Sequence, residues 1–153
     1  MTTVITYGTF DLFHVGHVRL LKRLSELGDR LIVGISTDEF NDVKGKKSFC
    51  SYNERAEIVQ SCRYVDEVFP ENSWEQKVRD IEMYKADIFA IGDDWQGRFD
   101  DLNKYCKVLY LSRTENISTT QIKKKLSHLN KEKLDTIESS LHDVIEIVKA
   151  MSV

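Results

Sequence analysis

The stretch Tyr7-Gly-Thr-Phe-Asp-Leu-Phe-His-Val-Gly-His17 is the part of the sequence around which the chain is organised. It follows an apolar run, Val4 to Tyr7, that predicts a strand, and it leads into residues 17–24, whose apolar side chains recur with helical spacing. Open α/β sheets bind ligands where a strand turns into a helix, and amides at a helix start suit phosphate. Gly8 lets that backbone come close to a ligand. The stretch therefore predicts a phosphate-binding turn.

Two histidines in this turn, His14 and His17, are three residues apart and are expected to stand near one another. They could be a structural pair, a metal site completed by Asp11, or two donors to a phosphate. Zinc usually takes three or four good ligands, and no further Cys or His lies nearby in the sequence. An apolar residue would pack better than an imidazole in a purely structural pair. Phosphate binding is the favoured interpretation, and no metal site is predicted.

The composition is that of an ordinary globular protein, and 153 residues fit one domain with a sizeable core. We find neither an apolar run of about 18 residues nor a basic-then-apolar leader, so neither a membrane span nor a secretory signal is predicted. Three cysteines without a Cys-x-x-Cys spacing indicate reduced thiols. A cytoplasmic protein is expected. A net charge of −3 gives no general attraction to nucleic acid, which is not expected as a partner.

Five apolar runs recur along the chain, separated by segments with helical spacing or capping signals. The runs are Val4–Tyr7, Leu31–Ile35, Glu67–Phe69, Ile88–Ile91 and Val108–Leu111. Strands that are apolar on both faces belong in a parallel sheet covered by helices and joined by right-handed crossovers. The pattern predicts an α/β fold with a parallel five-stranded sheet and helices on both faces.

Three of the intervening helices are expected to begin with a capping box, in which a serine and an acidic or amide residue three positions later bond each other's amides. The boxes are Ser51-x-x-Glu54, Ser73-x-x-Gln76 and Ser118-x-x-Gln121.

A lysine-rich loop follows the second predicted strand and leaves the same sheet edge as the histidines. It contains Lys44, Lys46 and Lys47 in a segment with little apolar content. Such a run is usually a solvated loop. Its position favours a second interpretation, in which the ammonium groups close over a phosphate and Gly45 allows the loop to move.

Other charged and aromatic residues allow two interpretations each. Arg55 lies near a helix start, where the dipole is unfavourable, so we expect an acidic or phosphate partner for it. Trp74 and Lys77 would share a helix face, as core residues or as ligand contacts. Arg63 and Asp66 could form a structural pair or a subunit contact.

The ends of the last two predicted strands also carry polar residues. Asp93 and Asp94 could bind a metal, accept from the amine of a base, or cap a turn. Arg113, Ser118 and Thr119 together predict a second anion site, because hydroxyls at a helix start and a guanidinium all donate to phosphate.

These motifs resemble those of a known family. Gly8-Thr-Phe-Asp-x-x-His14-x-Gly-His17 and Arg113-Thr-Glu-x-Ile-Ser-Thr-Thr120 resemble the cytidylyltransferases of the nucleotidyltransferase superfamily. With Arg63-Tyr-Val-Asp-Glu-Val68 and Gly92-Asp-Asp-Trp95 between them, they are most similar to the bacterial glycerol-3-phosphate cytidylyltransferases. The resemblance covers about residues 3–127 and implies a Rossmann-like domain.

The resemblance implies transfer of CMP from CTP to glycerol 3-phosphate, giving CDP-glycerol and pyrophosphate. Mg²⁺ would be the cofactor, carried by the CTP phosphates, and the product would serve teichoic acid or capsule synthesis. Two alternatives stay open: a cytidylyltransferase for another alcohol phosphate, such as ribitol phosphate or phosphocholine, and a nucleotide-binding scaffold without turnover.

The resemblance also implies roles for single residues. The residues implied to contact CTP are Thr9, Phe10, His14, His17, Lys46, Arg55, Asp94, Arg113, Thr114, Ser118, Thr119 and Thr120. Those implied to act in catalysis are His14, His17, Lys44 and Arg113, with the histidines stabilising charge around the α-phosphate. The implied acceptor site contains Lys44, Lys77 and Trp74, and the implied homodimer contact contains Arg63 and Asp66.

Two features depart from the family pattern. Asn116 stands where glycine is usual, and asparagine tolerates a left-handed backbone. The chain also continues, so we expect a cytidylyltransferase domain over residues 1–128 and an amphipathic helix over residues 129–153. This helix has a heptad row formed by Leu134, Ile137, Leu141, Val144, Val148 and Met151. The row is short for a coiled coil, so the helix could instead pack on its own domain. The favoured interpretation is self-association beyond the dimer, or docking of a partner.

Overall fold

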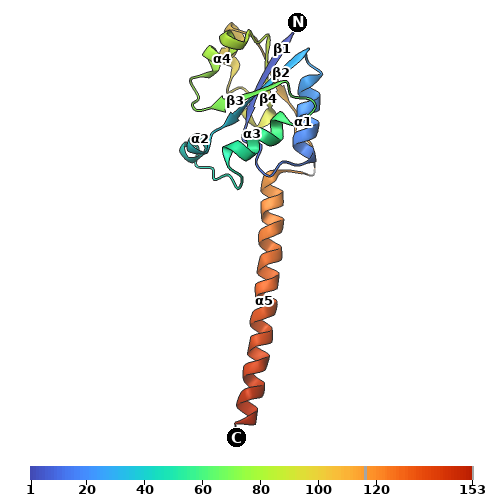
Figure 1. The fold of residues 1–153 in the computed structure, drawn as a ribbon, viewed down its shortest axis with the longest axis vertical. Helices are drawn as coiled ribbons and strands as arrows, with labels where there is room; N and C mark the ends of the chain where they lie inside the picture. Colours follow the sequence, from blue (N-terminus) through green and yellow to red (C-terminus); the bar gives the residue numbers. More distant parts are fainter. Residues whose placement is uncertain (116, 153) are drawn as a thin grey trace. The chain divides into compact units, whose positions relative to one another are not determined.

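The computed structural model describes residues 1–115 and 117–152, which fall into two compact units. The first unit, Met1–Asn116, holds the sheet, and the second, Ile117–Val153, holds the long helix α5 (Thr119–Met151) (Figure 1). The left-handed backbone expected at Asn116 lies outside the described residues.

The predicted parallel sheet of five strands is confirmed. The strands are β1 (Thr3–Gly8), β2 (Arg30–Ser36), β3 (Glu67–Glu71), β4 (Ile88–Gly92) and β5 (Lys107–Leu111). Their order is β3-β2-β1-β4-β5, and every neighbouring pair is parallel. The connections change direction between β1 and β4, so ligands are expected at the carboxyl ends of these strands.

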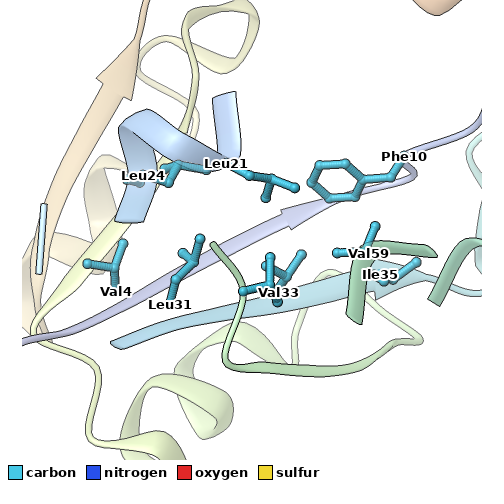
Figure 2. Close-up of a cluster of buried hydrophobic side chains, with 10 residues drawn as sticks. Val4, Phe10, Leu21, Leu24, Leu31, Val33, Ile35 and Val59 are labelled. Atoms are coloured by element: carbon cyan, nitrogen blue, oxygen red, sulfur yellow. The ribbon is translucent and has the colours of Figure 1, made fainter. Parts of the chain in front are cut away.

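Helices cover both faces of this sheet, as predicted. They are α1 (Val15–Ser25), α2 (Asp38–Val43), α3 (Tyr52–Gln60), α4 (Lys77–Tyr84) and the short 3₁₀ helices η1 (Asp93–Trp95) and η2 (Asp100–Lys104). One core cluster includes Leu21 and Leu24 of α1 and Val59 of α3, packed with residues of β1 and β2 (Figure 2). The opposite cluster includes Ile81 of α4 and Leu102 of η2. The alternation of side chains along β1 places Val4 in the first cluster and Ile5 in the second.

Two of the three predicted helix starts are confirmed. The capping box of Ser51 and Glu54 is present, and Ser118 Oγ accepts from the amide of Gln121. The start at Ser73 was wrong, because α4 begins at Lys77.

The physical reason lies in the Gln76 side chain, which closes the loop before α4. Its Oε1 accepts from the amides of Asn72 and Ser73, and its Nε2 donates to Pro70 O and Asp80 Oδ2. Half of the expected box therefore forms, but it shapes a turn and does not start a helix.

The helix α5 continues without a break through residue 128, the predicted boundary between the domain and the C-terminal helix. The two units divide between residues 116 and 117. The role assigned to residues 129–153 stays a prediction. Within residues 1–115 and 117–152, no helix combines the length and the apolar character that crossing a membrane requires.

A truncation of α1 tests the core contact that holds this helix on the sheet. Leu24 is 0% exposed. We expect Leu24→Ala to lower the free energy of unfolding by about 2–5 kcal/mol, because it removes buried methyl groups and leaves a cavity. Val43, 79% exposed, provides the control, and Val43→Ala should change stability by less than about 0.5 kcal/mol in the same urea titration. Equal effects of the two variants would contradict the assignment of Leu24 to the core.

Candidate active site

The turn after β1 has an unusual backbone that brings an aromatic ring over the end of the strand. Phe10 and Leu12 have φ angles of 54° and 47°, in the left-handed region. A Cβ atom added at Gly8 would lie 2.8 Å from the ring of Phe10. Gly8 is therefore needed here for a close approach of the Phe10 ring, which belongs to the core cluster under α1.

The two histidines of the motif form a capping box at the start of α1. His14 is the N-cap, and its Nδ1 accepts from the amide of Gly16 at 3.0 Å. His17 Nδ1 accepts from the amide of His14 at 3.2 Å, and the two ring centroids are 3.9 Å apart. Because both Nδ1 atoms accept, each neutral ring carries its proton on Nε2. The histidines are thus a structural pair that keeps an Nε2–H donor on each ring.

The surroundings of the two rings keep them neutral. Burial, with a smaller contribution from the neighbouring His14, lowers the pKa of His17 to about 4. Asp11 raises this pKa, but by less than His14 lowers it. Burial also lowers the pKa of His14. At pH 7 both rings are therefore neutral imidazoles.

Asp11 joins the turn after β1 to the lysine loop. Its side chain is 5% exposed, and its two carboxylate oxygens accept from the amides of Phe49 and Cys50 at 2.8 and 3.0 Å. These bonds give Asp11 a structural role. In the described part of the chain, no three His, Cys, Asp or Glu side chains come together as metal ligands.

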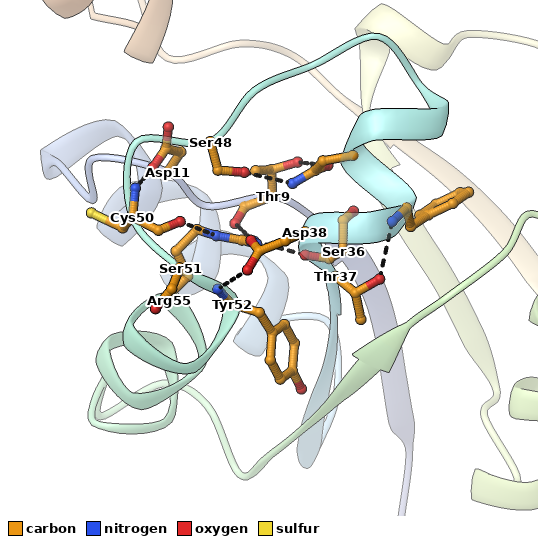
Figure 3. A network of polar contacts seen from close by, with 12 residues as sticks. Thr9, Asp11, Ser36, Thr37, Asp38, Ser48, Cys50, Ser51, Tyr52 and Arg55 are labelled. Atoms are coloured by element: carbon orange, nitrogen blue, oxygen red, sulfur yellow. Dashed lines mark hydrogen bonds and ion pairs between the residues drawn. The ribbon is translucent and has the colours of Figure 1, made fainter.

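The Arg55 guanidinium is buried and clamps three segments together (Figure 3). Its Nη1 donates to the carbonyls of Thr9 and Ser36, both at 2.8 Å. Its Nε donates to Cys50 O at 3.0 Å, and its Nη2 to Asp38 Oδ1 at 2.8 Å. The expected acidic partner is therefore Asp38. The clamp gives Arg55 a positioning role at the ends of β1 and β2, and its implied contact with CTP stays a prediction.

One carboxylate holds two lysines at the same edge of the sheet. Lys77 Nζ donates to Glu71 Oε1 at 2.6 Å, and both side chains are buried. Glu71 Oε2 accepts from Ser36 Oγ at 2.7 Å, and Ser36 Oγ accepts from Lys44 Nζ at 2.8 Å. The chain of bonds runs from Lys44 through Ser36 and Glu71 to Lys77, so two positive charges share one negative charge.

Aromatic rings surround these two ammonium groups. Lys77 Nζ lies 4.4 Å from the ring centroid of Tyr7 and 5.0 Å from that of Trp74. Lys44 Nζ lies 4.5 Å from the centroid of Phe40 and 5.6 Å from that of Trp74. The structure therefore brings together Lys44, Lys77 and Trp74, the three residues implied to form the acceptor site, and Trp74 touches both lysines.

The environment of Lys44 makes its charge sensitive to pH. Burial lowers the pKa of Lys44 to about 8. Glu71 raises this pKa, whereas the charges of Lys46, Lys77 and Arg55 lower it. Lys44 is therefore an ammonium group at neutral pH and loses its proton as the solution becomes alkaline.

Two residues implied to contact the nucleotide form an ion pair beyond β4. Arg113 Nη2 lies 3.0 Å from Asp94 Oδ2, and both side chains are more than half exposed. An exposed pair of this kind is worth about 0–1 kcal/mol, so a ligand can replace either partner at little cost. Lys46 Nζ lies 5.8 Å from the ring centroid of Trp95 on η1. The described contacts thus place Lys46 beside the Gly92–Trp95 motif.

The structure also describes the other residues that are implied to contact CTP. Thr9 Oγ1 donates to Asn41 Oδ1 at 3.0 Å. The residues Thr114, Ser118, Thr119 and Thr120 are divided between the two units, with Thr114 in the first. Their contacts with nucleotide stay predictions.

The proposed subunit contact also remains to be tested. Asp66 Oδ2 accepts from the amide of Leu31 at 2.8 Å, and the Arg63 guanidinium lies 5.8 Å from the ring centroid of Tyr64. Asp66 therefore ties together the starts of β2 and β3, and the homodimer stays a prediction.

Sequence reasoning missed two buried acids, Glu71 and Asp80. Glu71 ends β3 at the ligand edge, a position that could have singled it out. Asp80 lies within α4, away from any strand end, and nothing in its sequence position singles it out. Its Oδ2 accepts from Tyr7 OH at 2.9 Å, and burial, with a further effect of Asp80, raises the pKa of Tyr7.

Similar proteins carry the motifs described above. Residues 5–125 match the family model described as cytidylyltransferase-like. The glycerol-3-phosphate cytidylyltransferase of Bacillus spizizenii is 59% identical over 129 residues, which cover 84% of this chain and 100% of the relative. The enzyme of that name from Staphylococcus aureus is 55% identical over 126 residues, covering 82% of this chain and 96% of the relative.

A solved structure supports the fold. The lipopolysaccharide core biosynthesis protein of Thermoplasma volcanium has a TM-score of 0.65 at 24% identity, over 75% of this chain and 99% of that one. At this identity the likeness concerns the fold alone, and it agrees with the Rossmann-like sheet order. The family match spans the turn after β1, the lysine loop and the end of β5. The chain therefore belongs to the cytidylyltransferase-like family.

Proposed function

We propose that this protein transfers CMP from CTP to sn-glycerol 3-phosphate, giving CDP-glycerol and pyrophosphate. The observation that carries the proposal is the acceptor site, where Lys44 and Lys77 share Glu71 beside Trp74. This site lies at the carboxyl ends of the strands, as does the histidine turn. Identities of 55–59% to proteins named glycerol-3-phosphate cytidylyltransferase support the same substrates.

In the proposed reaction, an oxygen of the acceptor phosphate attacks the α-phosphorus of CTP. The bond from that phosphorus to the pyrophosphate oxygen breaks, and pyrophosphate leaves. A phosphate monoester has a second pKa of about 6, so its oxygen is already ionised at neutral pH and needs no general base. Catalysis can then rest on alignment and on stabilisation of the in-line transition state, with no covalent enzyme intermediate.

The neutral histidines suit this role. Each ring offers an Nε2–H donor, while its Nδ1 is held by a backbone amide of the same turn. Such fixed donors stabilise charge that develops on phosphate oxygens, at little cost in reorganisation. We assign His14 and His17 to the α-phosphate, and Lys44 and Arg113 to further phosphate oxygens.

Mg²⁺ is proposed as the cofactor, held by the CTP phosphates and water. Mg²⁺ keeps several waters and binds readily through substrate phosphates. This arrangement fits the donors of the described residues, where Asp11 is bonded to loop amides and Asp94 pairs with Arg113. The ion would neutralise part of the triphosphate charge.

The acceptor site favours a polyol phosphate over phosphocholine. A quaternary ammonium group binds best to open aromatic faces. Here Tyr7, Phe40 and Trp74 are already faced by the ammonium groups of Lys44 and Lys77, which would also repel a cation. Ribitol phosphate remains the second candidate acceptor.

The wider context is also proposed. CDP-glycerol would serve teichoic acid or capsule synthesis in the cytoplasm, and the three cysteines, none in a disulfide, agree with a reducing compartment. A homodimer through Arg63 and Asp66 completes the proposal.

Pyrophosphate release tests the proposed function directly. We expect turnover with CTP, Mg²⁺ and sn-glycerol 3-phosphate, and much slower release with ribitol 5-phosphate, phosphocholine or phosphoethanolamine. ATP in place of CTP is the nucleotide control. Turnover with another acceptor would keep the mechanism and change the substrate. CTP binding without any turnover would favour a nucleotide-binding scaffold.

The histidine pair should control the rate. His14→Ala and His17→Ala are each expected to reduce kcat by about 10²–10³, because each removes one donor to the transition state. His142 lies on α5 outside the family match, so His142→Ala is a matched control that should keep the wild-type rate. Rates near wild type for both motif variants would rule out the catalytic assignment.

The charge of Lys44 predicts a pH dependence of acceptor use. Below its pKa of about 8 Lys44 is charged and attracts the acceptor phosphate, and above that pH the attraction is lost. We therefore expect kcat/KM for glycerol 3-phosphate to fall as the pH rises through about 8. Glu71→Gln should move this fall to lower pH, because Glu71 raises the Lys44 pKa. A profile that Glu71→Gln leaves unshifted would contradict the coupling.

A further inference from the structure

The second half of α5 exposes a continuous row of apolar side chains. The row consists of Leu134, Ile137, Leu141, Val144, Val148 and Met151, which alternate three and four residues apart and are 56–79% exposed. Along Thr119–Met151, all of it described, no residue is buried. A helix with such a row usually packs it against another helix.

We propose that this apolar row is the interface through which copies of this chain associate, as a parallel coiled-coil bundle. The row lies outside residues 5–125, which the cytidylyltransferase-like family model matches. The association would therefore be a feature added to the catalytic domain, independent of the proposed reaction.

The charges beside the row favour a parallel arrangement. With Leu134, Leu141 and Val148 at heptad position a, Lys133 occupies position g and Glu138 position e. In a parallel pair, position g of one helix faces position e of the next heptad in its neighbour, five residues further on. Lys133 of one copy then faces Glu138 of the neighbouring copy, and the same pair forms again with the roles exchanged.

An antiparallel arrangement of the same row lacks this pairing. When Ile137 packs against Val148 of the neighbouring copy, Lys133 meets Ile147 and Glu138 meets Ser152. Neither charge then finds an opposite charge at the edge of the row. Charge complementarity therefore selects the parallel direction.

The side chains of the row also bear on the number of copies. Leucine at position a with a β-branched residue at d favours three or four helices over two. The first two heptads have this pattern, with Leu134 and Ile137 followed by Leu141 and Val144. Two further apolar residues, Ile145 and Ile147, widen the row on its two sides, at positions e and g.

A lipid surface fits the helix less well. Residues 131–151 carry three lysines and five acidic residues. Interfacial helices usually carry a basic polar face that is attracted to anionic lipid. An acidic helix would be repelled, so a protein surface is the better occupant.

Light scattering on the full-length chain tests the proposal. Leu141→Glu places a charge in the apolar row, and Ser139→Glu places the same charge at position f, on the opposite side of the helix. We expect Leu141→Glu to reduce the molecular mass at least twofold, and Ser139→Glu to keep the wild-type mass. The fluorescence of Trp74 and Trp95 reports whether the first unit stays folded. An unchanged mass for Leu141→Glu overturns the proposal, as does a monomeric wild-type chain.

Cysteine cross-linking tests the direction and does not depend on a destabilising change. In a parallel bundle Ile137 lies beside its own counterpart, so Ile137→Cys alone should form a disulfide between copies on mild oxidation. Ser139→Cys is the matched control, and the wild-type chain reports on the three native cysteines. A disulfide that forms only when Ile137→Cys is mixed with Val148→Cys would show antiparallel packing and overturn the parallel assignment.

Discussion

The buried guanidinium of Arg55 is the constraint on which the ligand edge of the sheet depends. It donates to the carbonyls of Thr9, Ser36 and Cys50, which belong to three separate segments. Asp38 balances its charge. A buried charge is costly unless it is both paired and hydrogen-bonded, and Arg55 meets both conditions. The ion pair and the hydrogen bonds offset the cost of burial, and they hold the turn after β1, the end of β2 and the loop before α3 in one arrangement.

The proposed acceptor site applies the same electrostatic principle with a different balance of charges. Glu71 is the acid in the bonded chain that links Lys44 and Lys77, so this chain carries two positive charges and one negative charge. The other buried acid, Asp80, accepts from Tyr7 and Gln76. A phosphate restores the balance. The aromatic rings beside the ammonium groups stabilise the cations through their π faces. The two lysines can therefore attract an anion, because Glu71 compensates only one of their two positive charges.

The histidine pair shows how a helix start can prepare a phosphate site. Capping is usually provided by serine, threonine, asparagine or aspartate, whereas here an imidazole does it. The bond to Nδ1 satisfies an amide of the turn and leaves the proton on Nε2. One interaction therefore serves both the local fold and the placement of a donor, and burial keeps the rings neutral.

Local sequence patterns were enough to predict the strands, their parallel arrangement, the turn after β1 and the lysines at the sheet edge. These features depend on local apolar spacing, on capping residues and on the rule that parallel strands end at one edge. The helix predicted from Ser73 was wrong because the Ser73-x-x-Gln76 spacing suits a turn as well as a capping box. Here Gln76 bonds Asn72 and Asp80 besides Ser73 and so shapes the turn.

The fold was needed to show which acid holds the two lysines, which groups surround Arg55 and which imidazole nitrogen carries the proton. Glu71, Ser36 and Lys44 come from separate elements, and Arg55 bonds a carbonyl 46 positions away. Such contacts depend on how the β2 and β3 ends and the loops converge in space, and residue spacing carries no information about that convergence. Burial, which sets the pKa values of His17 and Lys44, likewise exists only once the chain has folded.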